Sequence, residues 1–325
     1  MLKVRSAATA LAILTALSVL PLSASQAGSP ARGLHLTKEK STSNAASVGA
    51  SDGIGAVNYI MGGPIVANPN SYVIWYGNWD SQSCTPTPGS DSTASIINDL
   101  VTNIGDSPWN NINATYYQII KGIRTFVSPS IKYSGCVVDS GSVGLSLDGS
   151  TGPQVSDVVN HVLNSNLLPK DPNGVYLVLT SSNVNVNGFL TNFCGYHSFT
   201  ANDSSKILYA FVGDPSASLG SCVSQVLRSP NNNPAADGMA SVLAHELAEP
   251  ISDPYFTSWF DQSGLENADK CSWKYGDVIQ GANGSFSNME LGGRKFLIQQ
   301  NVPAHSNKCV SSVALSDQNG SGPKK

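Results

Sequence analysis

Residues 237–249 read Asp-Gly-Met-Ala-Ser-Val-Leu-Ala-His-Glu-Leu-Ala-Glu. This pattern predicts a helix over 237–248 with Asp237 as its N-cap, because apolar residues recur at helical spacing, at Met239, Val242, Leu243 and Leu247. The chain has only five glutamates in 325 residues, and three of them lie between His245 and Cys271. A His-Glu-x-x-Glu sequence would arise by chance in about one chain in a thousand of this composition. The helix is therefore the first candidate for a functional element.

The His-Glu-x-x-Glu sequence predicts a metal site. Residues four apart on a helix share a face, so His245 and Glu249 can bind one cation, and an imidazole with carboxylate oxygens suits Zn²⁺. We expect the third ligand to come from the segment after the helix. Glu266 is the first choice, and the alternatives behind it are Asp269, Asp261 and Asp253. Glu246 is the predicted general base acting on metal-bound water, as in His-Glu-x-x-His enzymes.

Several alternatives to a zinc site stay open. A glutamate in place of a second histidine adds negative charge, which favours harder ions such as Mn²⁺, Mg²⁺ or Ca²⁺. Pro250 disfavours helical geometry at Glu249 and would turn its carboxylate away from the helix face. The acidic residues can also be solvated or cap turns. His197, in Cys194-Gly195-Tyr196-His197, is a candidate further ligand, although a lone histidine after a strand is more often structural.

The N-terminus has the features of an export signal. Lys3 and Arg5 precede an apolar run, and Ser25-Gln26-Ala27 resembles a cleavage site, so we expect a signal peptide over 1–27. A single-pass anchor is the alternative. Loss of Lys3 and Arg5 changes the formal charge from −4 to −6, which gives no basic surface for nucleic acid or anionic lipid. The mature protein is predicted to be secreted, with no nucleic-acid partner and no membrane association.

The remaining pattern predicts one α/β domain with helices packed on a mixed sheet. Residues 28–57 are interpreted as a flexible leader, 58–312 as the domain and 313–325 as a disordered tail. Apolar runs predict strands over 72–79, 175–179, 207–212 and 295–299. Helical spacing predicts two further helices, one after Ser92 that Gly105 ends, and one over 156–167.

Six cysteines in an exported chain predict three disulfides. Fifteen pairings are formally possible, and no Cys-x-x-Cys occurs. Pairing of sequence neighbours is the favoured hypothesis, which gives Cys84 with Cys136, Cys194 with Cys222, and Cys271 with Cys309.

Many separate motifs resemble the Exordium (phosphate-induced protein 1) family in one consistent order. They include the 72–79 strand, Cys194-Gly195-Tyr196-His197, Tyr209-Ala210-Phe211-Val212-Gly213, and His245-Glu246-Leu247-Ala248-Glu249 with Asp253-Pro254, Trp259-Phe260-Asp261 and Leu265-Glu266. The resemblance implies a microbial, secreted relative of plant cell-wall-associated proteins linked to growth. Glu266 falls on a family glutamate whereas Asp269 does not, so the resemblance favours Glu266 as ligand. Plant members tend to have a cysteine where this chain has Leu190, so the local disulfide would differ.

The helix-borne motif also resembles zincin-type metallopeptidases, whose active-site helix packs beneath a mixed sheet. This likeness implies zinc-dependent hydrolysis of peptide bonds. The alternative is a non-enzymatic extracellular protein that binds a peptide or a cell-wall ligand. A third class, a glycan-active enzyme, would use Glu246 with Glu266 or Asp261 as a carboxylate pair.

Overall fold

The computed structural model describes residues 33–41, 55–149, 152–200 and 206–315, all within one compact unit, Ala31–Lys325. The predicted signal segment, 1–27, lies outside the described residues, as does 316–325 of the predicted tail. Within the described part, no helix combines the length and apolar composition that crossing a membrane requires.

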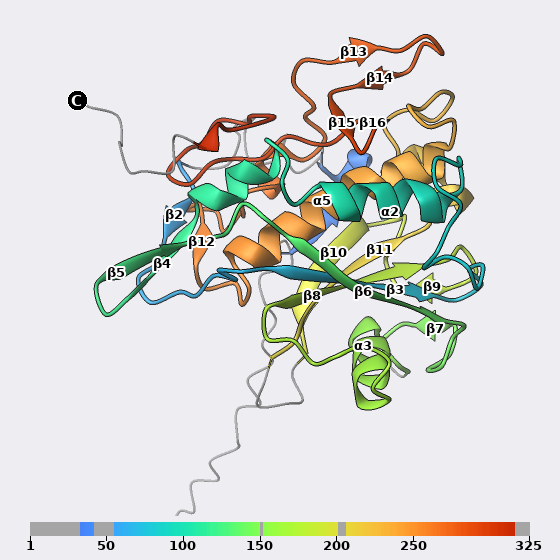
Figure 1. Cartoon of the computed structure of the whole chain (residues 1–325), viewed down its shortest axis with the longest axis horizontal. Helices are drawn as coiled ribbons and strands as arrows, with labels where there is room; N and C mark the ends of the chain where they lie inside the picture. Colours follow the sequence, from blue (N-terminus) through green and yellow to red (C-terminus); the bar gives the residue numbers. More distant parts are fainter. Residues whose placement is uncertain (1–32, 42–54, 150–151, 201–205, 316–325) are drawn as a thin grey trace, which may run out of the picture. The chain divides into compact units, whose positions relative to one another are not determined.

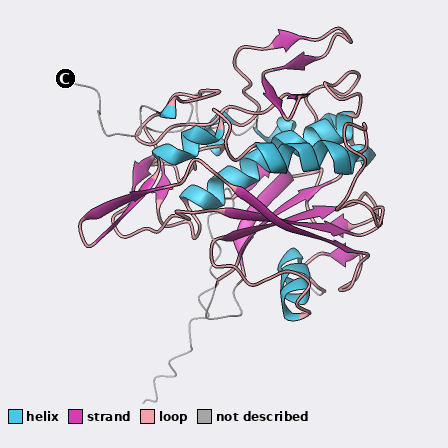
Figure 2. Ribbon diagram, viewed as in Figure 1, coloured by secondary structure: helices cyan, strands magenta, loops and turns pink. Residues whose placement is uncertain are grey.

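A six-stranded mixed sheet forms the centre of the fold (Figures 1 and 2). The order of its strands is β1 (Leu34–Leu36), β10 (Phe193–Phe199), β11 (Leu208–Gly213), β8 (Gly174–Thr180), β3 (Asn70–Tyr76) and β6 (Lys132–Asp139). The first three strands pair antiparallel, and the pairs from β11 to β6 are parallel. The predicted mixed α/β sheet is therefore confirmed.

Helices cover both faces of this sheet because the strand residues alternate between two cores. Val73 and Trp75 of β3 face a core shared with α2 (Thr93–Asn103) and α5 (Pro234–Ser252). Tyr72, Ile74 and Tyr76 face the opposite core, which α3 (Val155–Asn164) covers. Figure 1 shows α2 and α5 on one side of the sheet and α3 on the other.

Short elements complete the described part. The paired strands are β2 (Asn58–Tyr59) with β12 (Trp259–Phe260), β4 (Tyr117–Ile120) with β5 (Ile123–Phe126), β7 (Ser146–Leu147) with β9 (Asn185–Val186), β13 (Ile279–Gln280) with β14 (Phe286–Ser287), and β15 (Met289–Leu291) with β16 (Arg294–Phe296). The short helices include a helical turn over 38–41, α4 (Leu219–Cys222) and the 3₁₀ helices η1 (Asn110–Thr115), η2 (Pro215–Ala217) and η3 (Asp269–Cys271).

The central helix is longer than its sequence pattern predicts. α5 begins at Pro234, and Asn233 is its N-cap, with a side chain that accepts a hydrogen bond from the Ala236 amide. The prediction of Asp237 as N-cap is wrong, because Asp237 lies in the first turn. Pro250 lies inside the last turn and does not end the helix. Almost the whole helix is buried, so packing outweighs the local preference of the residue before a proline.

The predicted flexible leader contains a strand of the sheet. β1 pairs antiparallel with β10, and His35 at its centre is fully buried. The expectation that order begins near Asn58 is therefore wrong for residues 33–41. Val313, in the predicted tail, also bonds through its backbone amide to the Pro108 carbonyl. The predicted final strand, 295–299, is shorter and corresponds to β16.

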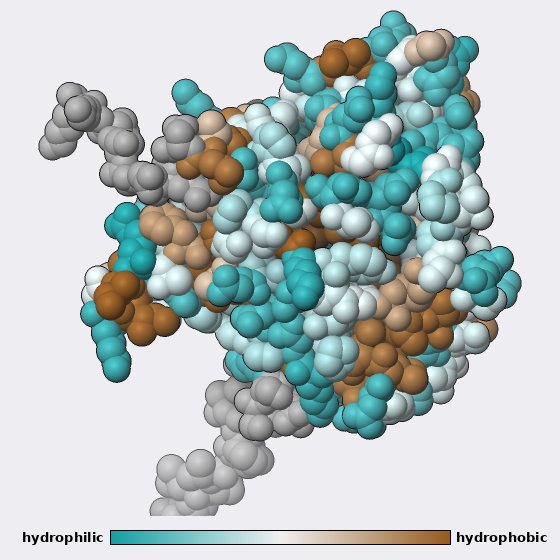
Figure 3. Space-filling view, in the orientation of Figure 1, coloured by the Kyte–Doolittle hydropathy of each residue, from teal (hydrophilic) through white to brown (hydrophobic). Residues whose placement is uncertain are grey.

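The three disulfides are Cys84–Cys136, Cys194–Cys222 and Cys271–Cys309, which is the pairing favoured by the sequence. Cys194–Cys222 ties β10 to α4, and Cys271–Cys309 ties η3 to the C-terminal segment. Several large apolar side chains are exposed on the surface of the described part. Ile120 and Ile123, at the tip of the β4–β5 hairpin, are 53% and 69% exposed, and the hairpin projects at the left of Figure 3.

Candidate metal centre

The fold brings the predicted site residues together in its interior. His245, Glu246 and Glu249 lie on α5, His197 lies on the neighbouring strand β10, and Glu266 lies in the loop before η3. All five side chains are at most 2% exposed. A cluster of this kind needs compensating charge, because burial of ionised groups is costly unless they are paired or bind a metal.

A glycine allows the helix and the strand to approach closely. A Cβ atom at Gly195 would meet the Val242 side chain at 2.7 Å and the Glu246 Cγ at 3.0 Å. A larger residue there would push α5 away from β10. The absence of a side chain at Gly195 therefore lets β10 and α5 pack closely enough for His197 to contact the glutamates of α5.

His197 forms one group with two glutamates of α5. Its Nδ1 atom lies 3.5 Å from Glu246 Oε2 and 3.3 Å from Glu249 Oε2. One ligand atom from each of the three residues lies within 4.8 Å of the others.

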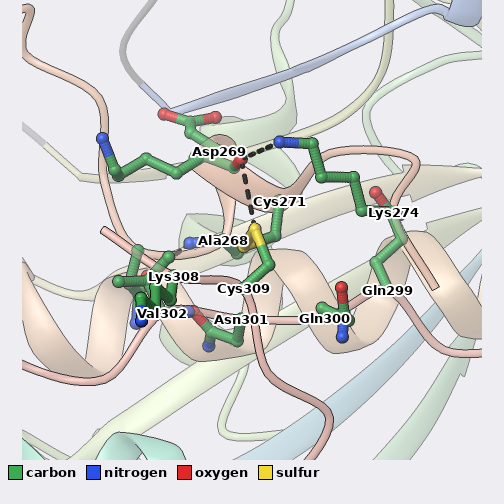
Figure 4. Close-up of a disulfide and its surroundings, with 12 residues drawn as sticks. Ala268, Asp269, Cys271, Lys274, Gln299, Gln300, Asn301, Val302, Lys308 and Cys309 are labelled. Atoms are coloured by element: carbon green, nitrogen blue, oxygen red, sulfur yellow. Dashed lines mark hydrogen bonds between the residues drawn. A yellow bond between two sulfur atoms is a disulfide. The ribbon is translucent and has the colours of Figure 1, made fainter. Parts of the chain in front are cut away.

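His245 forms a second group with Glu249 and Asp269. Its Nε2 atom lies 3.2 Å from Glu249 Oε1, as the four-residue spacing predicts, and 3.6 Å from Asp269 Oδ1. Asp269 is the first residue of η3, and the Cys271–Cys309 disulfide two residues later fixes this turn (Figure 4). The Asp269 amide also donates to Glu249 Oε1 at 2.9 Å.

Glu266, the first-choice third ligand from the sequence, lies with the other histidine. Its Oε2 atom is 3.5 Å from His197 Nε2, on the opposite side of that ring from the two helix glutamates. The place beside His245 and Glu249 belongs to Asp269, which the sequence ranks second. The structure thus brings together all four predicted ligands: His197 and His245 lie in separate groups that share Glu249, and Glu266 lies beside His197 outside both groups.

The two other candidate aspartates have different partners. Asp261 Oδ2 accepts a hydrogen bond from Lys270 Nζ at 2.6 Å, in a fully buried ion pair. Asp253 is the C-cap of α5, and its Oδ1 accepts from the amides of Thr257 and Ser258. Both carboxylates therefore organise the loop after the helix.

The atoms that face the centre lack hydrogen bonds. Within the described residues, no partner satisfies either ring nitrogen of His197 or His245, either carboxylate oxygen of Glu246 or Glu266, or Oε2 of Glu249. Buried polar groups are almost always hydrogen-bonded, so a concentration of unsatisfied atoms calls for a specific explanation. Coordination of a cation is one.

The pKa values of these groups reflect the uncompensated charge. Burial raises the pKa of Glu246 to about 7 and that of Glu266 well above its ordinary value. Burial and the nearby Glu249 raise the pKa of Asp269 to about 6. Burial opposes protonation of His245, but the carboxylates of Glu249, Asp269 and Glu246 together outweigh it and raise the pKa of this histidine to about 10. The cluster attracts positive charge.

The separations between the facing atoms fit shared ligation better than hydrogen bonding. Two ligand atoms at about 2.0–2.1 Å from one tetrahedral ion lie roughly 3.3 Å apart, and the four separations within the two groups are 3.2–3.6 Å. Nitrogen-to-oxygen hydrogen bonds are usually shorter, near 2.9 Å. The donor set of imidazoles and carboxylates suits Zn²⁺ or Mn²⁺.

Two neighbours of the centre are not predicted by the sequence analysis. His35, from β1, packs its ring edge-on against His245 with the centroids 4.3 Å apart, and its Nε2 contacts the Gln299 side chain. Burial and the charge of His245 lower the pKa of His35 to about 3, so it stays neutral. Phe256 packs on the His197 ring at 4.9 Å. The alternation in Leu34-His35-Leu36 is the available sequence signal for β1, and it is only three residues long.

Comparison with known proteins places the chain in a family. The region described as the phosphate-induced protein 1 conserved region matches residues 57–312. The chain belongs to the phosphate-induced protein 1 family. This membership confirms the resemblance drawn from the separate motifs.

Several plant members of this family are similar to this chain over most of their length, at low sequence identity. Protein EXORDIUM-like 5 of Arabidopsis thaliana is 30% identical over 308 residues, which covers 83% of this chain and 80% of that protein. Protein EXORDIUM of the same plant is 26% identical, with coverage of 78% and 87%. Protein PHOSPHATE-INDUCED 1 of Nicotiana tabacum is 22% identical, with coverage of 79% and 88%. No solved structure matches the chain.

Proposed function

We propose that this chain is a secreted, non-enzymatic Exordium-like protein whose buried His–carboxylate cluster binds divalent metal. The bound metal stabilises the fold, and Zn²⁺ is the preferred ion. The observation that carries the proposal is the set of unsatisfied atoms on His197, His245 and the helix glutamates. Their separations of 3.2–3.6 Å match the edges of a metal coordination polyhedron.

Burial favours a structural role for this cation. Structural metal sites are closed, whereas catalytic sites keep a coordination position open to substrate. His245 is 1% exposed and Glu246, Glu249 and Glu266 are 0% exposed. Phe256 covers one side of His197 and His35 covers one side of His245. An extracellular peptide or cell-wall ligand would then bind elsewhere on the molecule.

Secretion is supported by covalent structure and by the N-terminal sequence. Three disulfides with no free cysteine are typical of proteins that fold in an oxidising compartment. The export-like segment over 1–27 agrees with this compartment.

Metal content tests the proposal. Protein purified without chelator and analysed by inductively coupled plasma mass spectrometry is expected to contain a stoichiometric divalent metal. His245→Ala should lose most of it, because His245 faces Glu249 and Asp269. His161→Ala is the matched control, since His161 lies on α3, on the other face of the sheet. Wild-type protein that remains metal-free after dialysis against Zn²⁺ and Mn²⁺ would contradict the proposal.

A zinc-dependent hydrolase is the second candidate, favoured by Glu246. This residue follows His245, its carboxylate oxygens have no hydrogen-bond partner among the described residues, and burial raises its pKa to about 7, near the range for a general base. If the chain is a hydrolase, metal-loaded wild type cleaves a peptide library and Glu246→Gln loses about 10²-fold or more of that rate. The exposed Glu290→Gln is the control. Equal absence of cleavage in all three proteins supports the structural role.

A further inference from the structure

Glu249 directs its two carboxylate oxygens to two different histidines. Oε2 lies 3.3 Å from His197 Nδ1, and Oε1 lies 3.2 Å from His245 Nε2. Each histidine has its own additional carboxylate, Glu246 for His197 and Asp269 for His245. The two groups of ligands share only Glu249.

This arrangement is that of a bridging carboxylate between two ions. In two-metal sites the ions lie about 3.5–4 Å apart, a separation that the two oxygens of one carboxylate can span. We propose that the cluster is a two-cation site, in which Glu249 bridges one divalent ion held by His197 and Glu246 and a second held by His245 and Asp269. The inference rests on the proposed function, because it specifies how many ions the same cluster holds.

Charge balance supports two ions. Glu246, Glu249, Asp269 and Glu266 carry four negative charges when ionised, and all four side chains lie in the interior. Two divalent ions neutralise these charges with both imidazoles in their neutral, ligating form. With one divalent ion, the remaining two negative charges would have to be balanced by protons on the second imidazole or on a carboxylate instead of by ligand bonds to a cation.

Glu266 has a distinct place in this site. It faces Nε2 of His197, the ring nitrogen opposite the one that faces Glu246 and Glu249. When Nδ1 binds a cation, Nε2 carries the proton, and Glu266 is positioned to accept it in a hydrogen bond. Carboxylates commonly orient ligating histidines in this way. Glu266 is therefore a positioning residue for His197.

The loop that carries Asp269 is fixed around Glu249. The Asp269 amide donates to Glu249 Oε1 at 2.9 Å, and Asp269 Oδ2 accepts from the Glu266 amide at 3.2 Å. These bonds leave Asp269 Oδ1 directed at His245. Because a carboxylate oxygen has two lone pairs, Oε1 of Glu249 can accept this amide and also bind an ion.

Metal stoichiometry tests the inference. The full mature protein is loaded with Zn²⁺, dialysed and analysed for zinc per chain. We expect two ions in wild type and one in either Asp269→Asn or Glu246→Gln, because each variant removes a ligand that belongs to one group only. Asp277→Asn and Glu290→Gln are exposed controls that should keep two ions. Circular dichroism verifies that each variant is folded.

Electron paramagnetic resonance of the Mn²⁺-loaded wild type gives an independent measurement that needs no variant. Two bridged ions are expected to give an exchange-coupled spectrum, and a single ion gives the six-line spectrum of isolated Mn²⁺. One zinc per wild-type chain with an uncoupled manganese spectrum would overturn the two-cation inference and leave the proposed function standing. No bound metal in wild type would overturn both.

Discussion

Beside the candidate metal centre, Lys270 and Asp261 form an ion pair that has almost no access to solvent. Lys270 Nζ donates to Asp261 Oδ2 at 2.6 Å and to the Gly55 carbonyl at 3.1 Å. The other oxygen of Asp261 accepts from the Ser263 and Leu265 amides. The Asp261 carboxylate thus closes the turn after β12 and also balances the positive charge of Lys270. The pair keeps the 261–270 segment, and with it Glu266 and Asp269, in place.

Asp261→Asn should therefore destabilise the protein strongly. The substitution keeps the shape of the side chain but leaves the Lys270 ammonium buried without a counter-charge, which typically costs about 3–5 kcal/mol. Urea unfolding at neutral pH measures the change in the free energy of unfolding. Asp277→Asn, at an exposed position, should stay within about 0.5 kcal/mol of wild type. A loss below about 1 kcal/mol for Asp261→Asn would show that the pair does not hold the loop.

At this scale the sequence predicts contacts within one helix better than contacts across the fold. The proximity of His245 and Glu249 follows from their spacing alone. The choice between Glu266 and Asp269 does not, because it depends on how the loop returns to α5. That path is set by the Asp253 cap, which accepts from the amides four and five residues later, and by the Cys271–Cys309 disulfide, which joins residues 38 positions apart.

Among the elements, α5 explains why the centre is buried. Every residue from Ala236 to Ser252 is buried, because the sheet covers one side of the helix and α2, η1 and the C-terminal segment cover others. A helix that is buried all round has no polar stripe against which its apolar spacing stands out. The apolar spacing therefore locates α5 correctly but misses its first and last turns. The extra length of α5 matters for the site, because Glu249 is part of the helix and therefore lies one turn from His245 on the same face.

β1 is the element that the sequence does not reveal. Its three residues lie in a stretch rich in Ser, Ala, Gly and Lys, and its hydrogen bonds go to β10, far along the chain. A strand defined by such non-local pairing has little local signal. It nevertheless places His35 against His245, and the Gly33 carbonyl next to it accepts from the His197 amide.

Removal of β1 should weaken the fold and expose the centre. A chain that starts at Thr42 loses the buried His35 and the half-buried Leu34 and Leu36, and we expect it to be about 2–4 kcal/mol less stable than a chain that starts at Gly33. Urea unfolding of the two chains measures the difference. Equal unfolding midpoints would mean that residues 33–41 contribute nothing to stability, as the flexible-leader prediction assumed.

For the compact unit as a whole, the candidate metal centre brings together parts that are distant in sequence. His197 belongs to the central sheet, Glu246 and Glu249 to the helix above it, and Asp269 to the turn that Cys271–Cys309 fixes. Repulsion among the buried carboxylates would push these parts away from one another. A bound cation, as proposed, would convert that repulsion into attraction and hold these parts of the core together.

Metal removal should lower the stability of the whole molecule. A ligand that binds only the folded state at 100 times its dissociation constant adds about 2.7 kcal/mol to the free energy of unfolding, which for a domain of this size corresponds to a shift in Tm on the order of 5–10 °C. Differential scanning calorimetry of Zn²⁺-loaded and EDTA-treated protein, at one protein concentration, measures the shift. Glu249→Gln, which removes the carboxylate shared by both groups, should show almost no dependence on Zn²⁺, while Glu290→Gln should respond like wild type. If verified loss of the metal leaves the Tm of wild type unchanged, the cation does not stabilise the fold, and a role in hydrolysis becomes the better explanation for the cluster.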